Sequence, residues 1–173
     1  MENKIKASFP VILTNDCLEI SNLSQFGIYD CPISRKCKIQ DNPSGLVQFT
    51  VFNPKQKKIS FLKIDKCIFS DSSVLQRCDF AVFDSKTFCF VELKNSKKIN
   101  KSQENRRKAK DQLINTIAHF KSKFEFSTKR IEAYVCLGVT PPRPSEKAID
   151  LATSAEFAEI SVTLYFGNEK KFN

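Results

Sequence analysis

The chain has 173 residues, 41% of them hydrophobic and 16 of them phenylalanine, which predicts one globular domain with a substantial core. Lysine and arginine number 28 against 19 aspartate and glutamate, and the resulting formal charge of +9 favours a polyanionic partner such as nucleic acid or an anionic surface. The same charge also suits a basic protein that is merely soluble, because net charge bears on association and not on chemistry.

Seven cysteines make an odd number without a CxxC pair, and the chain has a single histidine. Neither a disulfide framework nor a zinc site is indicated, so we expect reduced, partly buried thiols. The apolar run Phe9 to Leu13 is shorter than the apolar core of a secretion signal, and nowhere do ~18 apolar residues follow one another. These features predict a cytoplasmic protein without a membrane span.

The first 45 residues are irregular beyond that apolar run, with a helix suggested only near Leu23. Residues 46–52 and 59–64 are rich in β-branched and aromatic residues and flank the polar link 53–58, which predicts a hairpin of two antiparallel strands. A second pair of strands is predicted at 79–84 and 87–94, joined at Ser85 and Lys86. This second pair is apolar on both faces, as in the middle of a covered sheet.

A long amphipathic helix is predicted within residues 101–126. Its apolar residues recur at three- and four-residue steps and should cover the sheet: Ala109, Leu113, Ile117, Phe120 and Phe124. The opposite face of the helix is strongly basic. The single histidine, His119, is expected to pack or to lie at the surface. Beyond this helix we expect a buried strand at 130–139, a break at the prolines of 141–144, a helix from Ser145 to Glu159 and a strand at 160–167.

An acidic residue two positions before a lysine occurs four times in the chain, and chance accounts for most of these pairs. Glu92 and Lys94 differ because they end an otherwise apolar strand, where alternation puts both side chains on one face. If Ser85 and Lys86 form a two-residue turn, Asp79 lies opposite Glu92 with Cβ atoms ~5 Å apart. Such a carboxylate pair needs neutralising, either by a bound Mg²⁺ or Mn²⁺ or by Lys94.

The segment CDFAVFDSKTFCFVELK, residues 78–94, resembles the core of the PD-(D/E)XK nuclease superfamily. The resemblance covers roughly residues 60–140 and implies a restriction-endonuclease-like α/β fold, with a mixed central β-sheet flanked by helices. It also implies that Asp79, Glu92 and the Leu93 carbonyl hold Mg²⁺ or Mn²⁺, with Lys94 beside the attacking water. Cys78 stands where the family often has proline, and Glu19 is the candidate for the acid that the family carries on an upstream helix.

Gln112, 18 residues after Lys94, is similar to a glutamine on the helix that follows the lysine strand in exonuclease-like branches of the family. Thr116 stands where that branch often has an aromatic residue, and an ordinary surface role for Gln112 is the alternative. A basic run follows the lysine strand, where it could contact the phosphates that flank the cleaved bond: Lys97, Lys98, Lys101, Arg106, Arg107, Lys108 and Lys110.

These observations predict a metal-dependent nuclease that hydrolyses phosphodiester bonds, with DNA as the expected substrate, in repair, recombination or defence. A carboxylate-held Mg²⁺ neutralises charge at phosphorus and provides hydroxide near neutral pH. Two alternatives stay open: a non-catalytic module of the same fold that binds nucleic acid or protein, and a small subunit of a larger nucleoprotein complex. The choice between DNA and RNA, between endo- and exonuclease, and between a monomer and a homodimer is also open.

Overall fold

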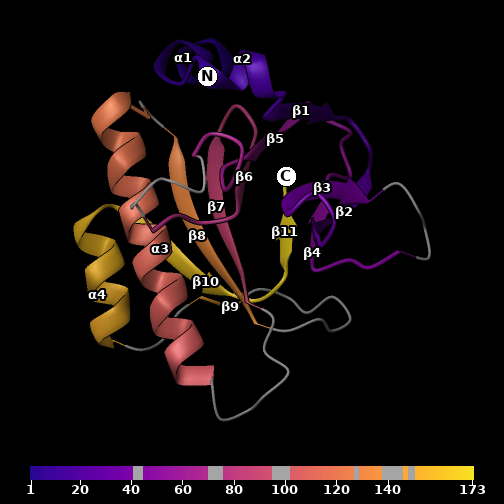
Figure 1. Cartoon of the computed structure of the whole chain (residues 1–173). Coiled ribbons are helices and arrows are strands. Elements are labelled where there is room, and N and C mark those ends of the chain that lie inside the picture. The colour runs from indigo at the N-terminus through magenta and orange to yellow at the C-terminus, as the bar shows by residue number, and fades with distance from the viewer. Residues whose placement is uncertain (41–44, 70–75, 95–101, 127–128, 138–145, 148–150) are drawn as a thin grey trace.

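The protein is described here from a computed structural model, which covers residues 1–40, 45–69, 76–94, 102–126, 129–137, 146–147 and 151–173. It is an α/β protein with two mixed β-sheets and few helices (Figure 1). The larger sheet has seven strands in the order β1-β5-β6-β7-β8-β10-β9, and the smaller sheet has four in the order β11-β4-β2-β3.

The elements have the following bounds. The larger sheet contains β1 (Leu18–Ser21), β5 (Ile59–Lys63), β6 (Phe80–Phe83), β7 (Thr87–Lys94), β8 (Arg130–Leu137), β9 (Glu146–Lys147) and β10 (Val162–Phe166). The smaller sheet contains β2 (Gln25–Cys31), β3 (Lys36–Gln40), β4 (Phe49–Phe52) and β11 (Glu169–Lys171). The helices are α1 (Glu2–Ser8), α2 (Val11–Asn15), α3 (Ser102–Lys123) and α4 (Leu151–Glu159). No described helix is long and apolar enough to cross a membrane.

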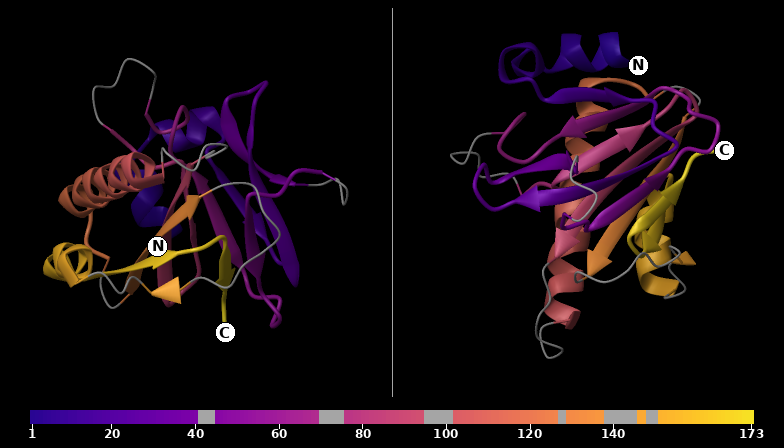
Figure 2. Two further views of the ribbon diagram at one scale, coloured as in Figure 1. Left: turned by 90° about the horizontal axis from the view of Figure 1, so that it is seen from below. Right: turned by 90° about the vertical axis from the view of Figure 1, so that its right-hand side faces the viewer.

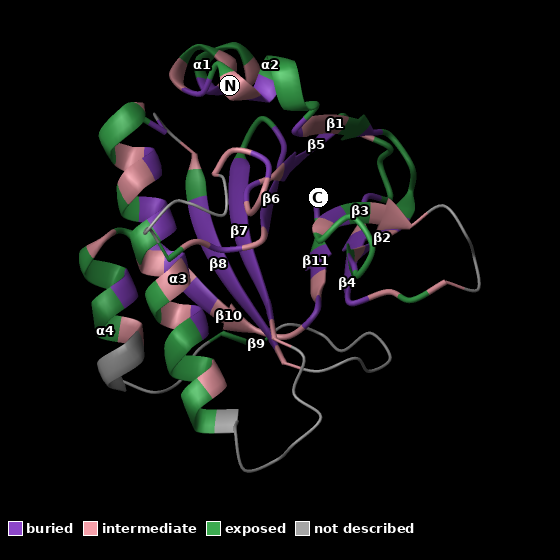
Figure 3. Ribbon diagram, in the orientation of Figure 1, coloured by how far each residue is buried: buried purple, intermediate pink, exposed green. Residues whose placement is uncertain are grey.

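The larger sheet is covered by helices on one face and by the smaller sheet on the other (Figure 2). Helices pack on one face, where Leu113 and Phe120 of α3 join Phe88 and Phe90 of β7 in one buried cluster. The smaller sheet packs on the other face, where its residues Phe49 and Val51 share a second cluster with the larger sheet. The mixed central sheet is as predicted, but the helices that the structure describes lie on only one of its faces. Burial on both faces explains why its middle strands are buried almost throughout (Figure 3).

The hairpin of β6 and β7 matches its prediction. Phe80 pairs with Val91 and Phe83 with Phe88, which is the register of a two-residue turn at Ser85 and Lys86. Asp84 closes this turn, because its Oδ1 accepts hydrogen bonds from the backbone amides of Lys86 at 2.8 Å and Thr87 at 2.7 Å.

The predicted hairpin of residues 46–52 and 59–64 is wrong. β4 pairs with β2 and β11 in the smaller sheet, whereas β5 pairs with β1 and β6 in the larger one. The link between them is held by the buried side chain of Asn53, whose Nδ2 donates to the carbonyls of Leu23 at 3.1 Å and Lys57 at 2.8 Å. This link carries the chain from the smaller sheet to the larger one, where β5 begins. β4 and β5 are each paired with other strands on both edges.

The predicted long helix is confirmed as α3, with Ala109, Leu113, Ile117 and Phe120 fully buried. The predicted strands near 130–139 and 160–167 correspond to β8 and β10. The helix predicted from Ser145 is wrong at its start, because residues 146–147 form the short strand β9 beside β10 and α4 begins at Leu151. The prolines of 141–144 lie outside the described residues.

The N-terminal region departs furthest from the predictions. Leu23 lies in the connection between β1 and β2 and not in a helix. Cys17 and Cys67 form a disulfide, which corrects the expectation that all seven cysteines are thiols. The bond ties the start of β1 to the turn after β5, two segments that already pack together in the core. The other five cysteines are free and buried: Cys31, Cys37, Cys78, Cys89 and Cys136.

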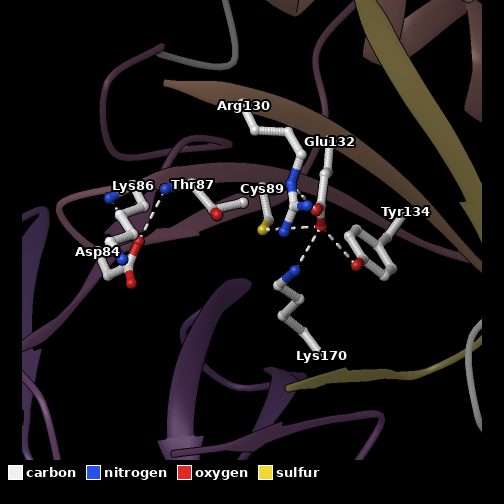
Figure 4. A network of polar contacts seen from close by, with 8 residues as sticks. All are labelled: Asp84, Lys86, Thr87, Cys89, Arg130, Glu132, Tyr134 and Lys170. Atoms are coloured by element: carbon white, nitrogen blue, oxygen red, sulfur yellow. Dashed lines mark hydrogen bonds and ion pairs between the residues drawn. The ribbon is translucent and has the colours of Figure 1, made fainter. Parts of the chain in front are cut away.

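A buried polar network connects the two sheets (Figure 4). Glu132 of β8 is only 1% exposed, and it accepts hydrogen bonds from Lys170 Nζ at 2.6 Å and from the Tyr134 hydroxyl at 2.7 Å. Arg130 Nε lies 2.8 Å from its other oxygen. Because Lys170 belongs to β11, this ion pair fixes the smaller sheet against the larger one.

Candidate active site

Two carboxylates meet at one end of the β6–β7 hairpin. Asp79 directly precedes β6, and Glu92 is the third residue from the end of β7. The register that pairs Phe80 with Val91 puts Asp79 opposite Glu92, as predicted. Glu92 is 1% exposed and Asp79 is half-buried.

Hydrogen bonds tie this carboxylate pair to the residues around it. Asp79 Oδ2 accepts a hydrogen bond from the backbone amide of Leu93 at 2.6 Å. Lys94 Nζ lies 2.5 Å from Glu92 Oε1 and donates to Gln112 Oε1 at 2.5 Å. The structure thus brings Gln112 to the end of the lysine strand, from the helix on which the resemblance placed it.

The second carboxylate oxygen of Glu92 has no partner. Oε2 is buried and no described residue donates a hydrogen bond to it. A buried acceptor without a donor is costly, and such a group in a native protein calls for an explanation. Two carboxylates with one lysine also leave an excess negative charge, which a cation would neutralise.

Both carboxyl groups are shifted toward their protonated forms. Burial raises the pKa of Asp79 from its ordinary 3.8 to about 7, against the opposing effects of the Leu93 amide and the Lys94 charge. Burial and then the charge of Asp79 raise the pKa of Glu92 well above its ordinary value. A divalent ion stabilises the charged forms of such groups, so the site favours metal binding over an empty, fully ionised pair.

One turn of α3 holds the chain just before Asp79. Gln112 Nε2 donates to the Arg77 carbonyl at 2.7 Å, and the Cys78 amide donates to Thr116 Oγ1 at 2.8 Å. Thr116 Oγ1 in turn donates to the Gln112 carbonyl at 2.7 Å. The role of Thr116 was not predicted, although its place four residues after Gln112 puts both side chains on one helix face.

The donor set suits a hard divalent cation. Carboxylate and carbonyl oxygens are the ligands that Mg²⁺ and Mn²⁺ prefer, and Mg²⁺ keeps several waters. Asp79, Glu92 and the Leu93 carbonyl could supply three such oxygens, and the unpartnered Glu92 oxygen fits a role as a ligand. No group of three His, Cys, Asp or Glu side chains poised for a metal occurs among the described residues, so water or substrate would complete the coordination.

The remaining predicted residues are placed as follows. Lys97, Lys98 and Lys101 lie outside the described residues. Arg106, Arg107 and Lys108 are exposed on α3 and Lys110 is half-buried. Lys108 lies one turn before Gln112 and pairs with Glu104 at 2.7 Å, while the Arg106 guanidinium lies 5.0 Å from the centre of the Phe166 ring.

Two further residues complete the comparison with the sequence. Glu19 lies on the edge strand β1 and pairs with Lys63, so its prediction as an acid on an upstream helix is wrong. His119 packs beside the rings of Phe9 and Phe69, with ring centres 6.0 and 5.2 Å away, in agreement with its expected packing role.

Comparisons with protein-family models, with curated proteins and with solved structures found no match to this chain. The resemblance to PD-(D/E)XK nucleases therefore rests on residues 78–94 and on the geometry of the site.

Proposed function

We propose that the chain is a divalent-metal-dependent nuclease of the PD-(D/E)XK kind, with Asp79, Glu92 and Lys94 at its active site. The observation that carries the proposal is the buried Glu92 carboxylate, which lies opposite Asp79 and pairs with Lys94 through one oxygen. No residue in the described part of the chain donates a hydrogen bond to its other oxygen. A purely structural ion pair would not be expected to leave the second oxygen of a buried carboxylate without a hydrogen-bond donor.

In this proposal Asp79, Glu92 and the Leu93 carbonyl hold Mg²⁺ or Mn²⁺. The bound ion would act as a Lewis acid and lower the pKa of a water molecule. Lys94 Nζ orients that water or a phosphate oxygen from its place beside Glu92. Gln112 Oε1 accepts a hydrogen bond from Lys94 Nζ and so fixes the direction of the ammonium group.

The proposed fold is the restriction-endonuclease-like one. Its support is the antiparallel run β5-β6-β7, followed by α3 and then by β8 parallel to β7 in a mixed sheet. α3 covers the face of the sheet that carries Glu92 and supplies Gln112 to the site. The four-stranded sheet on the other face is an addition to what the resemblance implies.

The proposed substrate is DNA, with RNA as the alternative outcome of the test. The exposed basic residues Arg106, Arg107 and Lys108 lie on the same helix as Gln112, on turns that precede it. Backbone phosphates are the natural partners of such residues, and their neutralisation makes binding depend on salt. Replacing all three by alanine should make that salt dependence shallower without changing metal affinity.

The decisive experiment is to incubate the pure protein with linear, circular and single-stranded DNA and with RNA, each with Mg²⁺, Mn²⁺ or EDTA. We expect cleavage with either metal and none with EDTA. Asp79→Ala should be inactive, whereas the exposed Glu125→Gln, which also removes one carboxylate charge, should cut like the wild type. Binding of DNA without cleavage, together with no Mn²⁺ binding by calorimetry, would favour the non-catalytic alternative.

A further inference from the structure

A small cleft opens beside Asp79. Its volume is about 120 Å³, and it is lined by Asp79, by the turn between β2 and β3 and by the turn after β5. A water molecule takes up about 30 Å³, so the cleft has room for about four waters or one phosphate group and not for a nucleotide base.

The lining combines both signs of charge. Three carboxylates and three cationic side chains face it: Asp30, Asp65, Asp79, Arg35, Lys36 and Lys66. Asp65 is engaged by Arg77, whose Nε lies 2.6 Å from its carboxylate. The charges of Asp30 and Asp65 raise the pKa of Asp79, which places both carboxylates within its electrostatic reach.

Two of the cationic residues adopt an unusual backbone conformation. Arg35 has φ 54° and Lys66 has φ 56°, in the left-handed region that favours glycine or asparagine. Five described residues other than glycine have positive φ, and two of these five line this one cleft. Strained backbone of this kind gathers at binding and catalytic sites. Here it puts two long cationic side chains at a cleft that is bounded by Asp79.

We propose that this cleft seats a phosphate of the substrate strand next to the cleaved bond, with Arg35 and Lys66 as its contacts. The proposal rests on the proposed nuclease function and extends it to the wall formed by the smaller sheet. Guanidinium and ammonium groups are the usual partners of phosphate oxygens. The Asp79 carboxylate at the edge of the cleft repels a phosphate until a cation is bound at Asp79 and Glu92, so nucleic-acid binding in the cleft depends on the metal.

The test compares charge-removing variants of equal type: Arg35→Gln and Lys66→Gln against Lys38→Gln. Lys38 is exposed on the same hairpin and does not line the cleft. All are made in a Lys94→Ala background, which we expect to bind metal without cutting. Fluorescence anisotropy of a labelled single strand with Mn²⁺ should show about tenfold weaker binding, or more, for each cleft variant, as for loss of one hydrogen bond to a charged group. Lys38→Gln should stay within about twofold, the range of an exposed charge.

A second measurement separates a seated phosphate from general attraction. In a series of oligonucleotides, one neutral methylphosphonate linkage replaces a different phosphate in each. At one position this replacement should weaken binding to the Lys94→Ala protein but should not weaken binding to the variant that also carries Arg35→Gln. Mn²⁺ affinity by calorimetry should not fall in either cleft variant, because the metal ligands are untouched.

Each outcome has a defined meaning. Equal affinity of the cleft variants and Lys38→Gln, with the wild type still cutting nucleic acid, would overturn the phosphate site and leave the nuclease proposal standing. Failure of the wild type to bind any nucleic acid would overturn both.

Discussion

The backbone amide of Cys78 donates a 2.8 Å hydrogen bond to Oγ1 of Thr116, a fully buried side chain of α3. Cys78 immediately precedes Asp79, and Gln112 holds the carbonyl of Arg77 one residue earlier. The single peptide group between Arg77 and Cys78 is therefore fastened to one turn of the helix through both its carbonyl and its amide. Asp79 cannot shift along the sheet without breaking these contacts.

Thr116→Val tests this positioning role. Valine keeps the shape but leaves the buried Cys78 amide without an acceptor, at a cost of about 1–3 kcal/mol. We expect lower stability in urea and weaker Mn²⁺ binding by calorimetry, and Thr116→Ser should restore both. Unchanged Mn²⁺ affinity in a destabilised Thr116→Val protein would show that the hydroxyl supports the fold alone.

Glu92→Gln should abolish metal-dependent cleavage and leave the metal-free protein as stable or more stable, because it removes one of two crowded carboxylates. The glutamine oxygen can still accept the hydrogen bond from Lys94. Asp79→Ala should also be inactive. Rates and thermal unfolding are compared with Glu125→Gln, and wild-type cleavage by both site variants would mean that the site is wrongly assigned.

The stability of the metal-free protein should fall as pH rises from about 4 to about 7. In this range an unfolded aspartate, with a pKa near 3.9, has lost its proton. Burial raises the pKa of Asp79 to about 7, so the folded state still holds its proton. The folded state binds more protons, and stability therefore decreases with pH.

Thermal unfolding in EDTA measures this effect. These two pKa values give a loss of about 3 kcal/mol between pH 4 and 7, which would lower the Tm by about 6–12 °C for a chain of this size. Asp79→Asn should flatten the profile. Saturating Mn²⁺ should raise Tm most at the upper end of the range, because the ion competes with protons for the same oxygens. A Tm that rises between pH 4 and 7 in EDTA would contradict the shifted pKa.

Gln112→Ala should lower turnover while the protein stays folded, because Lys94 loses the acceptor that orients its ammonium group. Gln112→Glu should change Mn²⁺ affinity by adding a third carboxylate near Glu92. Lys94→Ala, in contrast, should lose most of the rate and keep metal binding. Steady-state kinetics and calorimetry on the three variants separate these effects, and a Gln112→Ala protein with wild-type turnover would return Gln112 to a structural role.

Glu132→Gln should destabilise the protein by about 3–5 kcal/mol, because it leaves the buried ammonium of Lys170 without its charge partner. Lys171→Met removes a lysine from the strand that carries Lys170, but at an exposed position. It is the matched control for Lys170→Met and should be nearly neutral. Combining Glu132→Gln with Lys170→Met should cost less than Glu132→Gln alone. Additive losses in urea unfolding would mean that the two groups are not coupled across the sheets.

The sequence was sufficient for the hairpin that carries the site. A turn of two residues fixes the register, and register alone sets Asp79 against Glu92. The period of Leu113 and Ile117 likewise predicted the buried face of α3, and the resemblance put Gln112 on the helix that reaches the end of the lysine strand.

Other features depend on contacts between distant segments. The apolar residues of β4 and β5 predict burial but do not say which strands lie beside them, so two strands of different sheets looked like a hairpin. The pairing of Cys17 with Cys67 and the approach of the β2–β3 turn to Asp79 are set by the packing of the two sheets. Nothing local to Arg35 or Lys66 indicates that they share a cleft.

The parallel pairing of β11 with β4 constrains the order in which the protein can fold. Thr50 pairs with Glu169, and the amide of Thr50 donates to the carbonyl of Asn168. During synthesis β4, with its apolar residues Phe49 and Val51, is made long before residues 168–171. Until those residues are made, the edge of β4 that pairs with β11 stays unpaired. Pairing across such a separation is slow, and the waiting apolar strand is exposed to aggregation. Early packing of β4 on the β6–β7 hairpin would protect β4 from aggregation. We therefore expect folding to start at this hairpin, which also carries the candidate active site.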